Sequence, residues 1–135
     1  MVRKAAWILS ILVLANTGAL GLYNGVTELS EAHTALQRSV TVGVLIYGVL
    51  GVAGVVALIA RHGSAVWLTA GWAVVVTYVA SMAAIAYAGD DASVGGAIAA
   101  GLGAAVIGIG IVWCARMTTR PASLHDRVHA SGDAR

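Results

Sequence analysis

The side chains best suited to bind a metal ion lie between the apolar segments of this sequence. They are four carboxylates and one imidazole: Glu28, Glu31, His33, Asp90 and Asp91. Carboxylate oxygens are the ligands that Ca²⁺ prefers, and an imidazole nitrogen suits transition metals. The spacing of these residues matches no ligand loop, and a solvated acidic surface accounts for them as well. We therefore predict no metal site and keep the five residues only as candidates for a divalent cation.

Among the polar side chains within the apolar segments, three are candidates for a role beyond local structure: Asn16, Thr77 and Ser81. A hydroxyl can donate to its own helix, but an amide without a partner in hydrocarbon costs several kcal/mol. Asn16 is therefore expected to form an interhelical hydrogen bond that fixes the register of its helix, with Tyr47 or Tyr78 as candidate partners. The alternative is that the three polar residues line a small cavity or pore.

No group of residues in the sequence suggests catalysis or a bound cofactor. His125 and His129 stand four residues apart, so one face of a helix would hold both, but no third metal ligand accompanies them. Cys114 is the single cysteine, which excludes an intramolecular disulfide and a cysteine-based metal site. Without a nucleophile–base pair or an acid–base cluster, we predict that the protein is not an enzyme and holds no cofactor.

The segments that carry these residues are typical of a membrane protein. Hydrophobic residues make up 59% of the chain and charged residues 10%, whereas soluble domains carry about 25% charged residues. Four apolar segments of about 19 to 24 residues contain no Asp, Glu, Lys, Arg or His, and each is long enough to cross about 30 Å of hydrocarbon. They are residues 5–23, 40–60, 65–88 and 94–115.

These segments predict an all-α fold: an integral membrane four-helix bundle with antiparallel, up-down helices and short loops, formed by residues 1–119. We expect Ser30 to cap the second helix, which then begins near Glu31 ahead of the membrane. Gly63 is expected to close that helix, and Ser93 to cap the fourth. The transmembrane helices are predicted at about residues 5–23, 31–61, 65–88 and 94–117.

Charge placement predicts how the helices are oriented. Basic residues collect on the cytoplasmic side of membrane proteins. In a four-span arrangement Arg38 falls on one side, and the other seven of the eight basic residues share the opposite side: Arg3, Lys4, Arg61, Arg116, Arg120, Arg127 and Arg135. Both termini are therefore expected in the cytoplasm, in a bacterial inner (plasma) membrane. Residues 120–135 are predicted to be a polar cytoplasmic tail, disordered or a short surface helix. The basic residues form no run, so nucleic acid is excluded as a partner.

Small residues recur at spacings that suit close helix packing. Eleven of the sixteen residues in 95–110 are Gly or Ala. In membranes, small side chains let helix backbones approach and pack through van der Waals contact. This predicts packing within a compact bundle; the alternative is that the fourth helix also contacts another chain. The residues expected at these contacts are Gly96, Ala100, Gly101, Ala104 and Gly108 in the fourth helix and Gly48, Gly51 and Gly54 in the second.

These features favour a structural or accessory role over ion-coupled transport. Coupled transporters and proton relays usually carry an ionisable residue inside the membrane, and no apolar segment here contains one. We therefore predict a small membrane protein whose partners are the lipid bilayer and either a second copy of itself or another membrane protein. The alternative is a small channel or carrier for a neutral or small solute, formed by oligomerisation around the fourth helix.

Overall fold

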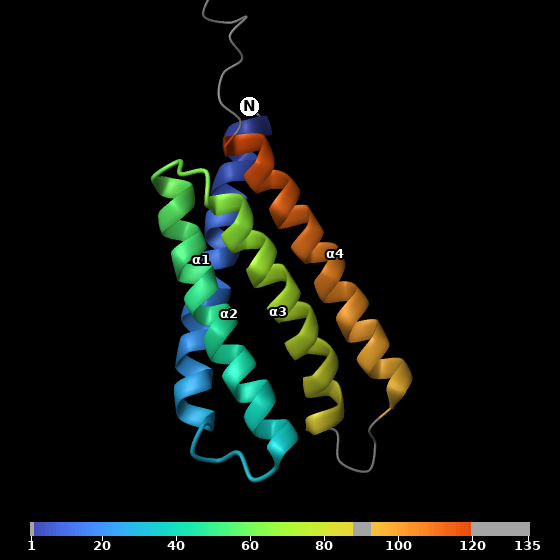
Figure 1. The fold of residues 1–135 in the computed structure, drawn as a ribbon. Coiled ribbons are helices and arrows are strands. Elements are labelled where there is room, and N and C mark those ends of the chain that lie inside the picture. Colours follow the sequence, from blue (N-terminus) through green and yellow to red (C-terminus); the bar gives the residue numbers. More distant parts are fainter. Residues whose placement is uncertain (1, 88–92, 120–135) are drawn as a thin grey trace, which may run out of the picture.

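The computed structural model describes residues 2–87 and 93–119 of the 135-residue chain. All regular structure in these residues is helical, as predicted. Consecutive helices lie side by side and run in opposite directions (Figure 1). The helices are α1 (Val2–Glu28), α2 (Ala35–Ile59), α3 (Ala65–Ala86) and α4 (Val94–Thr119).

All four helices are long and apolar enough to cross a lipid bilayer, which suggests a membrane location. The shortest, α3, has 22 residues and is about 33 Å long at 1.5 Å per residue. Large apolar side chains such as Leu12 and Ile98 are exposed on the outside of the bundle. The hydroxyl side chains of Ser10, Thr41 and Thr69 are buried inside it. This distribution of side chains suits a surface covered by lipid better than one covered by water.

Helices α1 and α2 touch through their backbones along a row of glycines. A Cβ atom added at Gly48 would lie 2.7 Å from the backbone nitrogen of Leu22. A Cβ atom added at Gly51 would lie 3.0 Å from the carbonyl oxygen of Leu14 and 3.0 Å from the Cα atom of Gly18. Contact between the two backbones leaves no room for a side chain at these positions. Glycine is therefore required for α1 and α2 to pack at this distance.

The centre of the bundle is filled by side chains from all four helices. Trp72 of α3 is 1% exposed and belongs to a buried cluster with residues of the other three helices, among them Leu14, Leu58 and Ile111. Gly54 lies beside this cluster, and a Cβ atom there would be at ordinary contact distance, 3.4 Å, from Cδ1 of Leu14. The buried Thr69 hydroxyl donates to the carbonyl of Ala65 in its own helix at 2.9 Å. Packed side chains therefore occupy the centre of the bundle.

The start of α2 differs from the prediction. Thr34 is the N-cap: its hydroxyl accepts from the Gln37 backbone N–H at 3.1 Å, and the Gln37 side chain accepts from the Thr34 backbone N–H at 3.1 Å. The expected start near Glu31 with Ser30 as the cap was wrong. This reciprocal capping satisfies two backbone donors at once, and Ser30 lacks a Glu or Gln three positions later to do the same. The Ser30 hydroxyl instead donates to the carbonyl of Thr27 at 3.4 Å.

Replacing Thr34 with alanine is expected to lower the free energy of unfolding by about 1 kcal/mol, because the N-cap hydrogen bond is lost. The midpoint of denaturation in detergent micelles measures this change. Thr27→Ala is the matched control, since the Thr27 hydroxyl donates only to carbonyls of its own helix, at 3.0 and 3.1 Å. Equal losses of stability in the two variants would contradict the capping role of Thr34.

The turn after α2 is closed by Arg61 rather than by Gly63, which corrects the prediction. Arg61 has a φ of 52°, in the left-handed region that favours glycine. The backbone N–H of His62 donates to the carbonyl of Ala57 at 2.9 Å, and that of Arg61 donates to the carbonyl of Leu58 at 3.3 Å. These two bonds form a Schellman motif. The turn therefore holds an arginine in a conformation that costs it about 1 kcal/mol.

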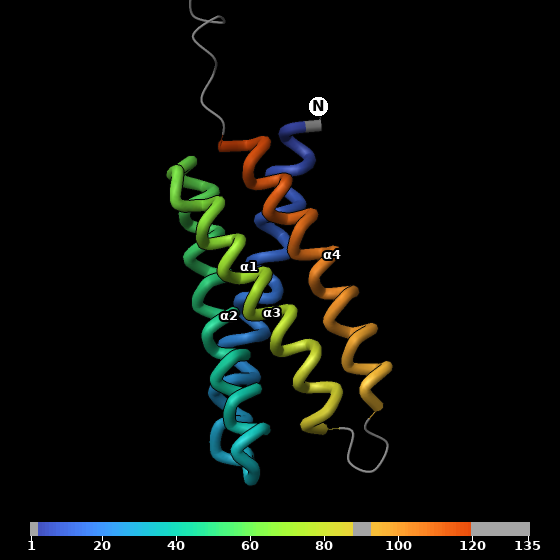
Figure 2. The backbone as a smooth tube through the Cα atoms, turned by 45° about the vertical axis from the view of Figure 1, so that its right-hand side comes forward, coloured from blue at the N-terminus to red at the C-terminus, as the bar shows by residue number. Residues whose placement is uncertain are grey.

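The four helices leave two ends of opposite charge. The N-terminus of α1 and the C-terminus of α4 lie together at one end, and α4 diverges from α1 toward the other (Figure 1 and Figure 2). The first end is called the basic end here because it carries Arg3, Lys4, Arg61 and Arg116. The opposite end, with Glu28 and Glu31, is called the acidic end.

Candidate functional site

Asn16 lies on the outer surface of the bundle and not between helices. It is exposed, and it stands within one residue of the midpoint of α1. The two tyrosines expected as its partners lie elsewhere. The Tyr78 hydroxyl is 3.2 Å from the Ser39 hydroxyl, and Tyr47 packs against Gly21. The interhelical hydrogen bond expected for Asn16 is therefore not formed within the part of the chain that the structure describes.

The glycines of α1 explain why Asn16 faces outward. At 3.6 residues per turn, successive residues are about 100° apart around the helix, so Asn16 lies about 200° from Gly18 and about 180° from Gly25. Both glycines face α2: a Cβ atom at Gly18 would lie 3.0 Å from the backbone nitrogen of Val52, and one at Gly25 would lie 2.5 Å from Cγ of Leu45. The position of Asn16 opposite these glycines was the sequence signal for its orientation.

The exposed residues on both sides of Asn16 follow the spacing of a coiled-coil contact. Steps of three and four residues alternate along this face, as in the a and d positions of a heptad repeat. Asn16 then occupies an a position at the centre. We call this surface the α1 seam; its exposed members are Leu9, Leu12, Asn16, Ala19 and Tyr23.

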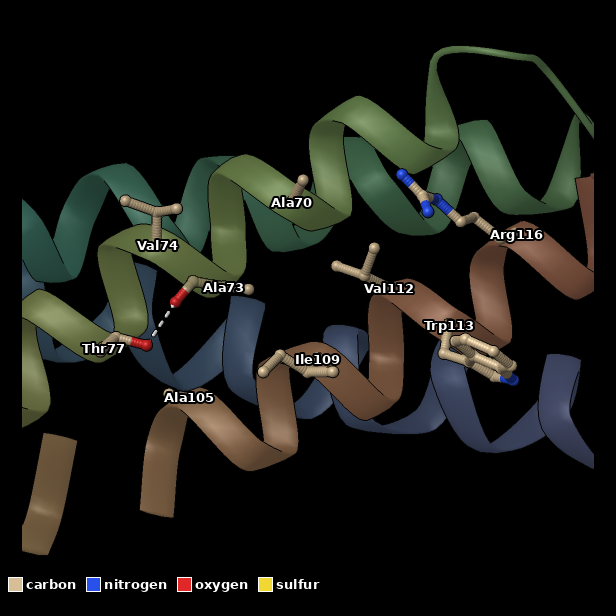
Figure 3. Close-up of a pocket in the computed structure, with 9 residues that line it drawn as sticks. All are labelled: Ala70, Ala73, Val74, Thr77, Ala105, Ile109, Val112, Trp113 and Arg116. Carbon is tan, nitrogen blue, oxygen red and sulfur yellow. Dashed lines mark hydrogen bonds between the residues drawn. The ribbon is translucent and has the colours of Figure 1, made fainter. Parts of the chain in front are cut away.

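Thr77 and Ser81 of α3 face α4, on a different side of the bundle from Asn16. The Thr77 hydroxyl donates to the carbonyl of Ala73 at 2.8 Å (Figure 3), and the Ser81 hydroxyl donates to the carbonyl of Thr77 at 2.9 Å. The Ser81 hydroxyl also occupies the space that a side chain at Gly101 would need. Among the described residues, Asn16, Thr77 and Ser81 therefore do not line a common cavity.

The buried face of α4 uses part of the small-residue row that the sequence suggested. Gly101 and Gly108 are buried, and a Cβ atom at Gly108 would lie 2.6 Å from Cβ of Ala73 in α3. The other expected residues lie at the edge of this face or outside it, with Ala100 and Ala104 half-buried and Gly96 exposed. Contacts between two helices recur at alternating steps of three and four residues. Gly96, Ala100, Ala104 and Gly108 follow one another at constant steps of four, so this row gradually turns away from the contact face.

The structure does not gather the candidate metal ligands into a site. In residues 2–87 and 93–119, no three His, Cys, Asp or Glu side chains come together in a way that could hold a metal ion. Glu28 is half-buried at the end of α1, whereas Glu31 and His33 are exposed in the connection to α2. The other candidates lie outside the described residues: Asp90 and Asp91, together with the tail histidines His125 and His129.

A pocket of about 250 Å³ with a mixed polar and apolar lining lies at the acidic end, beside Glu28. Glu28 and Asn24 of α1 line it together with Tyr47 of α2 and Tyr87, which follows α3. One carboxylate, one amide and two phenols can form hydrogen bonds there with water or with a small polar molecule. Sequence patterns did not reveal this pocket because its residues come from three different helices.

An apolar groove of about 450 Å³ runs between α3 and α4 (Figure 3). It exists because the residues that face each other are small: Ala70 and Ala73 on α3 and Ala105 on α4. Trp113 and Arg116 stand where the groove reaches the basic end. The mostly apolar lining of this groove suits a lipid acyl chain.

A third hollow, of about 350 Å³, lies at the basic end. Three basic side chains line it: Arg3 and Lys4 from the start of α1, and Arg61 from the turn between α2 and α3. Thr118 of α4 also lines this hollow. The sequence predicted that the basic residues lie on one side of a membrane. Only the packing of α1 against α2 and α4 brings three of them to one pocket.

Comparisons with protein-family models, with curated proteins and with solved structures find no match to this chain. The function of the protein must therefore be inferred from its own surfaces, namely the α1 seam and the three hollows.

Proposed function

We propose that this chain is an integral membrane protein with a structural, non-catalytic role, and that it assembles with a second copy of itself through the α1 seam. The length and apolar character of the four helices support the membrane location. The charge of the basic end supports an orientation with both termini in the cytoplasm, as in a bacterial inner membrane. The acidic end, with Glu28 and Glu31, then faces outward.

The observation that carries this proposal is the exposure of Asn16. Its amide lies at the middle of α1, so in a bilayer it meets lipid tails near the centre of the hydrocarbon. An amide without a hydrogen-bond partner there costs several kcal/mol, and a polar side chain across a helix interface removes that cost. A second chain packed on the α1 seam supplies such a partner.

A second copy fits the α1 seam better than an unrelated chain. Copies inserted in the same orientation pair about an axis perpendicular to the membrane, so their α1 helices run parallel and identical residues meet. Each Asn16 amide then donates one hydrogen bond to its counterpart and accepts another. In parallel coiled coils, a single Asn at an a position specifies the register and the number of helices. The heptad spacing of Leu9, Leu12 and Tyr23 supports the same arrangement.

The filled centre of the bundle supports the structural role over a channel or carrier within one chain. Trp72, Leu14 and Leu58 are each less than 2% exposed and occupy the space that a pore would need. Asn16 and Thr77, which such a pore would share as polar lining, belong to different faces of the bundle.

A pore formed around α4 by several copies is the second candidate function. It is favoured by the outward face of α4, where Cβ atoms added at Gly95, Gly103 and Gly110 would meet no atom within 4 Å. This face would let the α4 helices of several copies approach closely.

Replacing Asn16 with leucine is expected to raise the dissociation constant of the dimer in detergent about fivefold, because interhelical hydrogen bonds of this kind contribute about 1 kcal/mol. Energy transfer between labelled copies measures this constant. Thr17→Val is the matched control on the same helix. The Thr17 hydroxyl donates to the carbonyl of Val13 at 2.7 Å, so its removal should leave the dimer unchanged.

Disulfide cross-linking in native membranes identifies the helix that forms the interface. In a Cys114→Ala background, Asn16→Cys is expected to yield a covalent dimer under mild oxidation, whereas Gly103→Cys on α4 is not. A chain that is monomeric at every concentration would overturn the proposal. So would cross-linking at position 103 alone, or co-purification of a different membrane protein in equal amount. Solute flux into liposomes that is blocked by Gly103→Leu would favour the pore around α4.

A further inference from the structure

The pocket at the basic end gathers positive charge from separate parts of the chain. Its three basic side chains are those of Arg3, Lys4 and Arg61, and Trp7 also lines it. The carboxylates of the described residues belong to Glu28 and Glu31 at the acidic end, so no described carboxylate neutralises the pocket. The preference for basic residues on the cytoplasmic side explains their presence at this end, but it does not require them to line one hollow of about 350 Å³.

Three hydrogen bonds hold the wall of this pocket in place. The Nε and Nη2 atoms of Arg3 donate to the carbonyl of Met117 at 3.1 and 2.8 Å. Met117 lies in the last turn of α4, where carbonyls lack partners within their own helix. The indole Nε1 of Trp7 donates to the carbonyl of Leu58 at 3.1 Å, which ties α1 to α2. The remaining N–H groups of the Arg3 guanidinium are left for a ligand.

The backbone of Arg61 supplies an independent reason to assign a role to this pocket. Its φ of 52° is a conformation that glycine adopts without strain and arginine does not. A strained residue that persists in a turn points to a task for its side chain beyond closing the turn. At Arg61 that side chain is a guanidinium that lines the basic pocket.

We infer that this pocket binds the phosphate-bearing headgroup of an anionic phospholipid in the cytoplasmic leaflet. Guanidinium and ammonium groups form charge-assisted hydrogen bonds with phosphate oxygens, and basic pockets at the ends of membrane helices suit such headgroups. Ile8, which is 51% exposed and also lines the pocket, lies where the first part of an acyl chain would pass along α1. The inference depends on the membrane insertion proposed above, but not on the dimer.

Binding of defined lipids to the purified full-length protein tests this inference. Three probes are compared in a neutral detergent: dioleoylphosphatidylglycerol, dioleoylphosphatidylcholine and inorganic phosphate. Native mass spectrometry and the shift of the thermal unfolding midpoint measure binding. Phosphatidylglycerol is expected to bind about tenfold more tightly than phosphatidylcholine, and inorganic phosphate at the same concentration is expected to leave the midpoint unchanged. Equal protection by inorganic phosphate would overturn the assignment to a lipid.

Two variants show whether the basic pocket is the binding site. Arg61→Gly removes the guanidinium and relieves the backbone strain, so the protein is expected to fold at least as well as the wild type. Combined with Lys4→Gln, it is expected to weaken phosphatidylglycerol binding about tenfold. Arg38→Gln, which removes a basic residue at the opposite end, is the control and should bind this lipid as the wild type does.

An unchanged affinity in the double variant would overturn the inference, and so would an equal loss in Arg38→Gln. Cross-linking at position 16 is measured separately from lipid binding. A failure of the lipid site is therefore distinguishable from a failure of the proposed dimer.

Discussion

Replacing Trp72 with alanine is expected to lower the free energy of unfolding by about 3 kcal/mol, among the largest effects in this chain. Trp72 is 1% exposed at the centre of the bundle, in contact with the cluster that contains Leu14 and Ile111. In a bilayer an apolar side chain gains little by leaving lipid, so the loss comes mainly from the cavity and its missing van der Waals contacts. The expected loss of stability is therefore at the lower end of the range that is typical when a large buried aromatic side chain is replaced by alanine.

Two matched variants separate the packing of Trp72 from its polarity. Its indole Nε1 has no hydrogen-bond partner among the described residues, so Trp72→Phe removes an unpaired donor and keeps most of the ring volume. We expect Trp72→Phe to stay within about 1 kcal/mol of the wild type. Trp67→Ala removes the same side chain from a site that is 80% exposed, and its cost is expected to be below about 1 kcal/mol. Equal midpoints for Trp67→Ala and Trp72→Ala in denaturant titrations would contradict a packed centre.

A second large effect is expected at Gly48, where alanine should lower the free energy of unfolding by about 2 kcal/mol. Alanine forms helices better than glycine by about 1 kcal/mol, which by itself would stabilise the variant. A net loss of stability therefore has to come from the packing of α1 against α2. The added Cβ atom would lie 2.7 Å from the backbone nitrogen of Leu22 and 3.0 Å from the carbonyl carbon of Gly21. Backbone atoms cannot rotate away as a side chain can, and α1 and α2 would have to separate.

Gly110→Ala is the control for Gly48→Ala, because it makes the same chemical change on an open helix surface. A Cβ atom at Gly110 would meet no atom within 4 Å. Its stability is expected to equal or slightly exceed that of the wild type, owing to the better helix propensity of alanine. If Gly48→Ala and Gly110→Ala were destabilised equally, the contact between α1 and α2 would not be the cause of the loss of stability at Gly48.

Local signals were sufficient to predict the number and type of the elements. Long apolar segments without charge predicted four helices, because each backbone must satisfy its own hydrogen bonds where water is absent. The cap at Ser93 was also predictable: its hydroxyl accepts from the backbone N–H of Gly96 at 3.0 Å. The start of α2 was not, because two residues between α1 and α2, Ser30 and Thr34, can cap a helix. The choice of Thr34 over Ser30 depends on a reciprocal bond with Gln37.

The candidate sites were less predictable than the helices. Asn16 was singled out from the sequence, yet its expected partner was a neighbouring helix of the same chain. The pocket beside Glu28 and the basic pocket around Arg61 were not predicted, because each collects residues from different helices. Sequence spacing relates residues on one helix and carries no information about which residues of another helix stand opposite.

The sequence by itself determined that this protein has four apolar helices long enough for a bilayer, with basic residues gathered at one end. Only the tertiary structure decided which face of each helix is buried. These helices are apolar on all sides, so hydrophobic periodicity does not mark an inner face. The close approach of Gly18 to Gly51 determines how α1 is rotated, and that rotation exposes Asn16 on the surface. The same packing places Arg3 and Arg61 in one pocket.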